Sequence, residues 1–101
     1  MAESEVTFIN VIDVDPEKQA EVVKLLKEGT ESVISKRPGF VSVTLLASKD
    51  GRHVVNIAKW KSVADIQATQ GDPAAAEFAK RTAAIAKANP GVYDVVGHYS
   101  A

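Results

Sequence analysis

Three runs of alternating apolar and polar residues predict β-strands in the first part of the chain. They span residues 6–14, 40–47 and 52–60. The first run has β-branched residues at both odd and even positions, so both of its faces are apolar and we expect a central strand. The segment Ser48-Lys49-Asp50-Gly51 separates the other two runs, and its Asp-Gly pair predicts a hairpin turn with positive φ angles.

Helical spacing of apolar residues fills the intervals between these strands. The first predicted helix begins at Asp15-Pro16-Glu17, with Asp15 as N-cap, and stops at Lys36-Arg37 before Pro38-Gly39. Gly29 lies within it, and we expect this glycine either to admit a closely packed strand or to bend the helix.

Two more helices and a strand are predicted in the last 40 residues. A short helix near residues 62–70 has Ser62 as its N-cap. Asp72-Pro73 then caps a longer helix that reaches about Ala88, and residues 92–99 form the final strand.

This order of elements predicts one α+β domain over residues 1–101, with a ferredoxin-like βαββαβ fold. Such a fold has a four-stranded antiparallel sheet with both helices on one face. Because every predicted strand is apolar on both faces, the uncovered face needs a partner, and we expect a homodimer.

Composition excludes several classes of function. Charge is nearly balanced, with a net charge of −1, so we expect no nucleic-acid partner. The chain has no cysteine and two histidines, so we expect no metal site. No apolar run is long enough to span a bilayer and the first residues lack the pattern of a signal peptide, so we expect no membrane association and a cytoplasmic location.

The third predicted strand carries the residues best suited to bind a small molecule. Asn56, Ala58 and Trp60 alternate along it and therefore share one face. An amide, an indole and a small residue between them predict a pocket for a planar ligand. The alternative is that Trp60 only fills the core and Asn56 hydrogen-bonds a neighbouring backbone group.

Several motifs in order resemble the antibiotic-biosynthesis monooxygenase family over nearly the whole chain. They are Pro38-Gly39-Phe40, the Asp-Gly hairpin, Val54-Val55-Asn56 followed by Trp60, and Asp72-Pro73. The resemblance implies a dimeric α+β barrel, and its best-understood members are similar to anthrone and quinol oxygenases that use O2 without metal, flavin or haem. It implies that Asn56 and Trp60 are catalytic, bonding the substrate oxygen and the reduced oxygen species. It also implies an aromatic, polyketide-type substrate that is bound by Asn10, Ala58, Ile66 and Phe78.

The chain departs from that pattern at two positions. Ile66 stands where some oxygenases have a tyrosine, and Ala79 where they have an arginine, with Lys80 and Arg81 adjacent. We expect the latter two to be rotated away by about 100° per residue. Three side chains on other elements are candidates to replace the missing polar groups: Tyr93, Tyr99 and His53. For the two tyrosines we otherwise expect a structural role, with the ring packed and the hydroxyl directed toward water.

The sequence alone leaves three other functions open. A haem-degrading branch of the superfamily would use Asn10 and Trp60, but its helical histidine falls near Ala79, which leaves iron without an axial ligand. A non-catalytic dimeric small-molecule-binding or stress-related module would fit the two departures. A polyketide cyclase would need an acid or base, for which His53 and Asp94 are the candidates. Whether a dimer exchanges its C-terminal strands also stays open.

Overall fold

The computed structural model describes residues 5–101 and has an antiparallel sheet of five strands with three α-helices. The strands are β1 (Val6–Val14), β2 (Phe40–Ala47), β3 (His53–Trp60), β4 (Ala86–Lys87) and β5 (Pro90–Tyr93). The helices are α1 (Gln19–Ser32), α2 (Val63–Gln70) and α3 (Pro73–Ala83), and two 3-10 turns are η1 (Pro16–Lys18) and η2 (Ile34–Lys36). The sheet order is β2-β3-β1-β4, with β5 also paired to β1. This confirms the ferredoxin-like α+β prediction.

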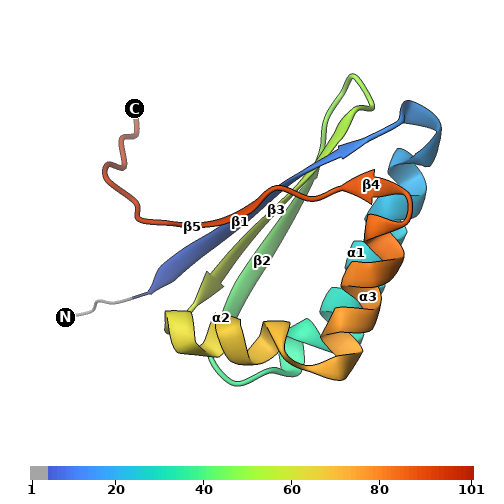
Figure 1. Cartoon of the computed structure of the whole chain (residues 1–101). Helices are drawn as coiled ribbons and strands as arrows, with labels where there is room; N and C mark the ends of the chain where they lie inside the picture. The colour runs from blue at the N-terminus through green and yellow to red at the C-terminus, as the bar shows by residue number, and fades with distance from the viewer. Residues whose placement is uncertain (1–4) are drawn as a thin grey trace.

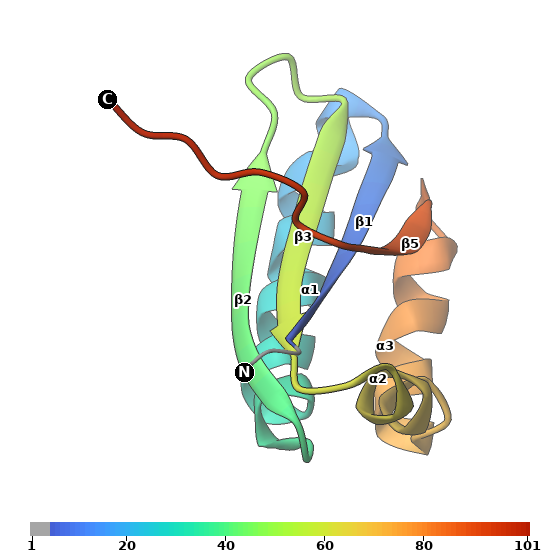
Figure 2. The same ribbon diagram turned by 90° about the vertical axis from the view of Figure 1, so that its left-hand side faces the viewer.

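The helices lie on one face of the sheet. Figure 1 shows α1 and α3 along this face, with α2 across the end where β3 stops, and Figure 2 shows the opposite face. Ile12 and Val54 of the central strands pack against Val22 of α1, and all three are almost fully buried. No helix or strand among residues 5–101 covers the opposite face, which exposes Leu46 and Tyr93. No helix among residues 5–101 is long and apolar enough to cross a membrane.

The C-terminal part differs from the sequence prediction. The alanine-rich stretch predicted the third helix to reach about Ala88, but α3 ends at Ala83 because Ala86 and Lys87 pair with Val14 and Asp13 of β1. The single strand predicted over residues 92–99 is also wrong. Its pairing residues are 90–93, in β5, and residues 94–101 have no regular structure.

The first helix differs at both ends. The Asp15 side chain makes no capping hydrogen bond, and its backbone carbonyl instead accepts one from the Lys18 N–H in η1. The regular helix ends at Ser32, and η2 completes the connection to Arg37. Gly29 faces another helix and not a strand, since a Cβ there would lie 3.1 Å from Cγ of Phe78 in α3. The predicted caps Ser62 and Asp72 are confirmed, as each accepts a hydrogen bond from a backbone N–H three residues ahead.

The predicted hairpin is confirmed, but only Gly51 of the Asp-Gly pair has a positive φ, of 80°. The Asp50 carboxylate closes the turn by accepting from the Ser48 hydroxyl at 2.7 Å and from the Arg52 N–H at 3.0 Å. The Ser48 hydrogen bond, followed by that from Arg52, lowers the pKa of Asp50 from its usual value.

The Pro38-Gly39-Phe40 turn fixes α2 against the start of β2. Gly39 has φ +85°, and a Cβ there would collide with the Asp65 side chain in the first turn of α2. Asp65 is itself held by the Ser62 hydroxyl, which donates to its carboxylate at 2.9 Å. The Lys61 N–H donates to the Gly39 carbonyl at 2.8 Å. Only glycine allows the two segments to approach this closely.

Replacing Gly39 with alanine should therefore destabilise the protein by about 2 kcal/mol or more, from the left-handed φ and the collision with Asp65 together. Urea unfolding measures the change. Gly71→Ala is the control, because Gly71 has φ −84° and the nearest atoms to its added Cβ are 3.7 Å away. We expect its free energy of unfolding to change by less than about 0.5 kcal/mol. Equal losses in the two variants would contradict this account of the turn.

Candidate active site

A cavity of about 380 Å³ lies between the helix-covered face of the sheet and helices α2 and α3. We call it the main cavity. Its lining is mostly apolar or aromatic, with Asn10, Asn56, Thr69 and Gln70 as the polar members. The remaining lining residues are Phe8, Ile34, Val43, Ala58, Trp60, Ile66, Ala75, Ala76, Ala79, Ala88 and Pro90. This combination of size and lining is typical of sites for small organic molecules.

Asn56 projects into the main cavity from the centre of β3. Its Oδ1 atom is buried and has no hydrogen-bond partner among residues 5–101. Leaving an amide oxygen buried and unpaired costs about 1–3 kcal/mol, so such atoms are rare in folded proteins. The Asn56 oxygen therefore bonds no neighbouring backbone group and is available to a ligand that donates a hydrogen bond.

Trp60 forms the wall of the main cavity where β3 ends. It is 3% exposed and packs with Ala58 and Ile66 in one buried cluster. The Phe40 ring meets its indole edge to face, with ring centroids 5.8 Å apart. These contacts hold the indole rigidly, so Trp60 fills the core and also lines the cavity.

Arg37, which precedes β2, connects the sheet to helices α2 and α3, which form the helical wall of the main cavity. Its guanidinium lies 3.4 Å from the Asp72 carboxylate at the start of α3, and its Nε donates to the Thr69 hydroxyl at 3.4 Å. Ile66 and Ala79 both line the main cavity, so the two departures from the family pattern make its wall less polar. Arg81 points elsewhere, with its guanidinium 5.1 Å from the centre of the Phe78 ring.

A smaller cavity of about 180 Å³ adjoins the main cavity between α1 and α3. Asn10 and Asn56 line both cavities. Phe78 lines only the smaller one. Six residues were predicted for the site. Five of them line the main cavity, and Phe78 lines the adjoining smaller cavity.

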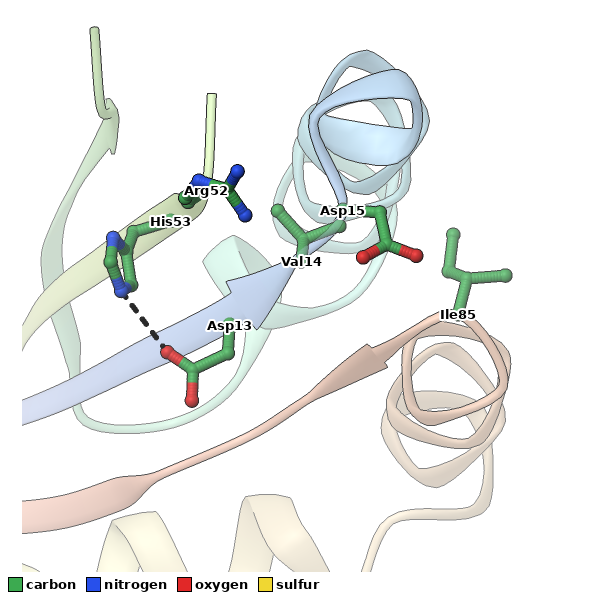
Figure 3. A pocket seen from close by; sticks show the side chains of 6 residues that line it. All are labelled: Asp13, Val14, Asp15, Arg52, His53 and Ile85. Carbon is green, nitrogen blue, oxygen red and sulfur yellow. Dashed lines mark ion pairs between the residues drawn. The ribbon is translucent and has the colours of Figure 1, made fainter. Parts of the chain in front are cut away.

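The side chains considered as polar replacements lie outside the main cavity. His53 is three residues from Asn56 and therefore projects from the opposite face of the sheet, where its Nε2 is 3.2 Å from Oδ1 of Asp13. Figure 3 shows this pair in a third cavity, of about 360 Å³, which Asp15 and Arg52 also line. Tyr93 lies on that same opposite face, paired with Thr7, and Tyr99 is 92% exposed. Within residues 5–101, no group of three potential metal ligands lies together.

Sequence reasoning missed much of the helical wall. Thr69, Gln70, Ala75 and Ala76 line the main cavity but were not predicted. Helical spacing was the available signal, because Thr69 and Gln70 lie three and four residues beyond Ile66 and so share its face. Alanine carries no chemical signal of its own, so Ala75 and Ala76 could be found only from the position of α3.

Asn56→Leu should raise the free energy of unfolding by about 1 kcal/mol, because it removes the unpaired oxygen and keeps the volume of the side chain. Urea unfolding tests this. Asn10→Leu is the matched control: the Asn10 oxygen accepts from the Asn89 N–H at 2.9 Å, so this change should destabilise the protein by about 1–3 kcal/mol. A loss of stability in Asn56→Leu would mean that Asn56 is a structural residue.

Most of the chain matches a known protein family. Residues 6–81 match the family model described as antibiotic biosynthesis monooxygenase. The tetracenomycin-F1 monooxygenase of Streptomyces glaucescens is 49% identical over 67 residues, which cover 66% of this chain and 60% of that protein.

Solved structures of similar proteins extend the match to almost the whole chain. An alanine variant of SnoaB, a cofactor-independent oxygenase from Streptomyces nogalater, is 25% identical, with a TM-score of 0.83 over 95% of this chain and 97% of that one. The monooxygenase ActVA-Orf6 of Streptomyces coelicolor, in complex with nanaomycin D, is 28% identical, with a TM-score of 0.82 over 95% of this chain and 91% of that one. The protein belongs to the antibiotic biosynthesis monooxygenase family.

Proposed function

We propose that the protein is a cofactor-independent monooxygenase that oxidises an aromatic quinol- or anthrone-like substrate of polyketide type with O2. The observation that carries the proposal is the buried, unpaired Oδ1 of Asn56 beside the Trp60 wall of an apolar cavity. A phenolic substrate satisfies both features, because its rings suit the apolar walls and its hydroxyl can donate to Asn56. The similar proteins include a monooxygenase and a cofactor-independent oxygenase, and these relatives support the same class of reaction.

In the reaction that we propose, the substrate supplies all of the electrons. A ring CH2 group made acidic by the neighbouring carbonyl loses a proton to solvent water before the site closes on the substrate, and the resulting carbanion gives one electron to O2. The substrate radical and superoxide then couple, which forms a C–O bond, and the protonated hydroperoxide loses water to leave a carbonyl. One CH2 and one O2 thus become one C=O and one H2O. The protein contributes by orienting the substrate and excluding water, and Asn56 and Trp60 are the residues we propose for this.

The lining of the main cavity favours this reaction over ring closure. None of the described residues that line it carries an acidic or basic side chain. A cyclase needs a positioned acid or base. His53 projects from the opposite face of the sheet, and Asp94 is exposed beyond the end of β5. Substrate oxidation needs only a substrate that is acidic and electron-rich.

With an anthrone and ¹⁸O2, we expect the product to contain one labelled oxygen, with O2 uptake above the rate in buffer. Asn56→Leu and Trp60→Phe should each lower the catalysed rate roughly 10–100-fold, as expected when a transition-state contact is lost. Mass spectrometry and an oxygen electrode give the two readouts. Rearranged product without label would indicate a cyclase. Ligand binding without O2 uptake by folded protein would indicate a non-catalytic module.

We also propose that a second copy of the chain covers the open face of the sheet. Leu46 is 48% exposed there, and Tyr93 is 49% exposed. The segment 94–101 extends away from its own domain, as Figures 1 and 2 show, and exposes Val96 almost completely. An apolar face next to an extended apolar segment suits a twofold interface in which each copy buries the same surface of the other.

Leu46→Lys should convert a dimer into a monomer at micromolar concentration, because an interface cannot easily bury an unpaired charge. Sedimentation equilibrium measures the mass. Val63→Lys is the control, since Val63 has a similar exposure of 43% but lies on α2, away from the open face. A wild-type protein that sediments with the mass of one chain would refute the proposal.

A further inference from the structure

The smaller cavity between α1 and α3 shares part of its lining with the main cavity. Six residues line both, and they therefore lie where the two cavities meet: Asn10, Ile34, Asn56, Ala75, Ala79 and Ala88. Trp60 and Ile66 line only the main cavity, so the smaller cavity lies across this junction from the Trp60 wall. A molecule in the smaller cavity is thus a direct neighbour of a ligand in the main cavity.

The two cavities differ in what they can hold. Pockets that bind small organic molecules measure roughly 300–1,000 Å³. The main cavity, at about 380 Å³, lies within that range, and the smaller cavity, at about 180 Å³, lies below it. The smaller cavity therefore has room for a single ring of a larger ligand or for a small gas molecule.

Apolar side chains make up most of the lining that belongs to the smaller cavity alone. Ile12 and Leu25 are buried there, and the two polar members are Thr30 and Thr82. The Thr82 hydroxyl already donates to the Phe78 carbonyl at 2.9 Å. A buried water molecule needs two to four polar partners, whereas an apolar cavity of similar size stays free of water and binds xenon or a small apolar molecule.

Small residues on the two facing helices leave this space open. Gly29 of α1 brings no side chain into the cavity, and Ala79 and Ala83 of α3 bring only methyl groups. A Cβ at Gly29 would lie 3.1 Å from Cγ of Phe78, so the helices already pack closely beside the cavity. The cavity therefore follows from the sequence of the two helices, which cannot move closer together to fill it.

We propose that the smaller cavity binds O2 beside the substrate. O2 is apolar and needs no hydrogen-bonding partner, so the lining suits it. From this position it accepts one electron from the substrate carbanion, and the superoxide and substrate radical then join in the C–O bond. A substrate that filled both cavities would leave O2 neither of them. The inference rests on the proposed function, because it takes O2 as the oxidant and the main cavity as the substrate site.

Xenon tests the site without turnover. Dissolved xenon should shift the methyl resonances of Ile12 and Leu25 in proton–carbon correlation spectra. Thr82→Leu should remove these shifts, because a larger buried side chain fills the cavity. Ala74→Leu is the matched control, since Ala74 lies on the same helix, is exposed and lines neither cavity. Xenon shifts confined to the main cavity would overturn the proposal.

A three-ring ligand decides between O2 and a substrate ring as the occupant. The probe is 1,8-dihydroxyanthraquinone, which has no CH2 group to oxidise and whose binding quenches Trp60 fluorescence. We expect the xenon shifts at Leu25 to persist when the anthraquinone is bound. Displacement of xenon would mean that the smaller cavity holds a ring of the substrate, and the O2 site would be overturned.

Steady-state kinetics test the role in the reaction. In Thr82→Leu the KM for O2 should rise roughly 10-fold while the KM for an anthrone stays unchanged, because only the binding of O2 is weakened. Leu25→Phe serves if Thr82→Leu does not fold, and Ala74→Leu should keep both wild-type values. An oxygen electrode at several O2 concentrations gives the readout. An unchanged KM for O2, or equal increases in both KM values, would overturn the proposal.

The two sets of measurements fail separately. A protein that binds xenon as described but does not oxidise anthrones would refute the proposed oxygenase and retain an apolar gas-binding cavity. An active oxygenase whose KM for O2 is the same in Thr82→Leu and Ala74→Leu would refute the O2 site and retain the oxygenase.

Discussion

The antiparallel pairing of β1 with β3 is the constraint on which the rest of the structure depends. This register sets Asn10 opposite Asn56, and it also sets Ile12 opposite Val54 in the centre of the core. A slip of one residue would turn every side chain of β1 to the other face, which would expose the core and remove Asn10 from the main cavity. Folding and site assembly therefore use the same contacts, and the core residues beside the amides keep the register in place.

The opposite wall of the cavity depends on fewer contacts. Helices α2 and α3 contact the segment before β2 at two points. Gly39 packs against Asp65 of α2, and Arg37 bonds both Thr69 and Asp72. The Arg37–Asp72 pair is about a quarter exposed, so it contributes at most about 1 kcal/mol. The sheet thus forms a rigid wall of the cavity and carries the asparagines. The helices form an apolar wall that fewer contacts hold in place. This arrangement suits a site that must admit a ligand between the two.

Period-two alternation was enough to predict the sheet and the shared face of Asn56, Ala58 and Trp60, because both depend only on local geometry. The prediction failed where tertiary pairing opposed local preference. Alanine-rich residues 84–88 favour helix, but Ala86 and Lys87 pair with β1. The hydrogen bonds of Asn89 to β1 were missed for the same reason. An asparagine before Pro90 predicts a turn, and its partners lie 76 to 79 residues earlier in the chain.

Neutral amides suit this cavity better than charged groups would. A carboxylate or ammonium group in so apolar a space would lose hydration that few neighbours could replace, and its pKa would shift toward the neutral form. An amide stays neutral, and its cost when unpaired is about 1–3 kcal/mol, which a ligand hydroxyl recovers on binding. The unpaired Asn56 oxygen therefore lowers the stability of the protein slightly, and under the proposed function it would favour ligands that donate a hydrogen bond. A neutral amide with a buried, unpaired oxygen therefore fits the ligand-binding role that we propose for Asn56.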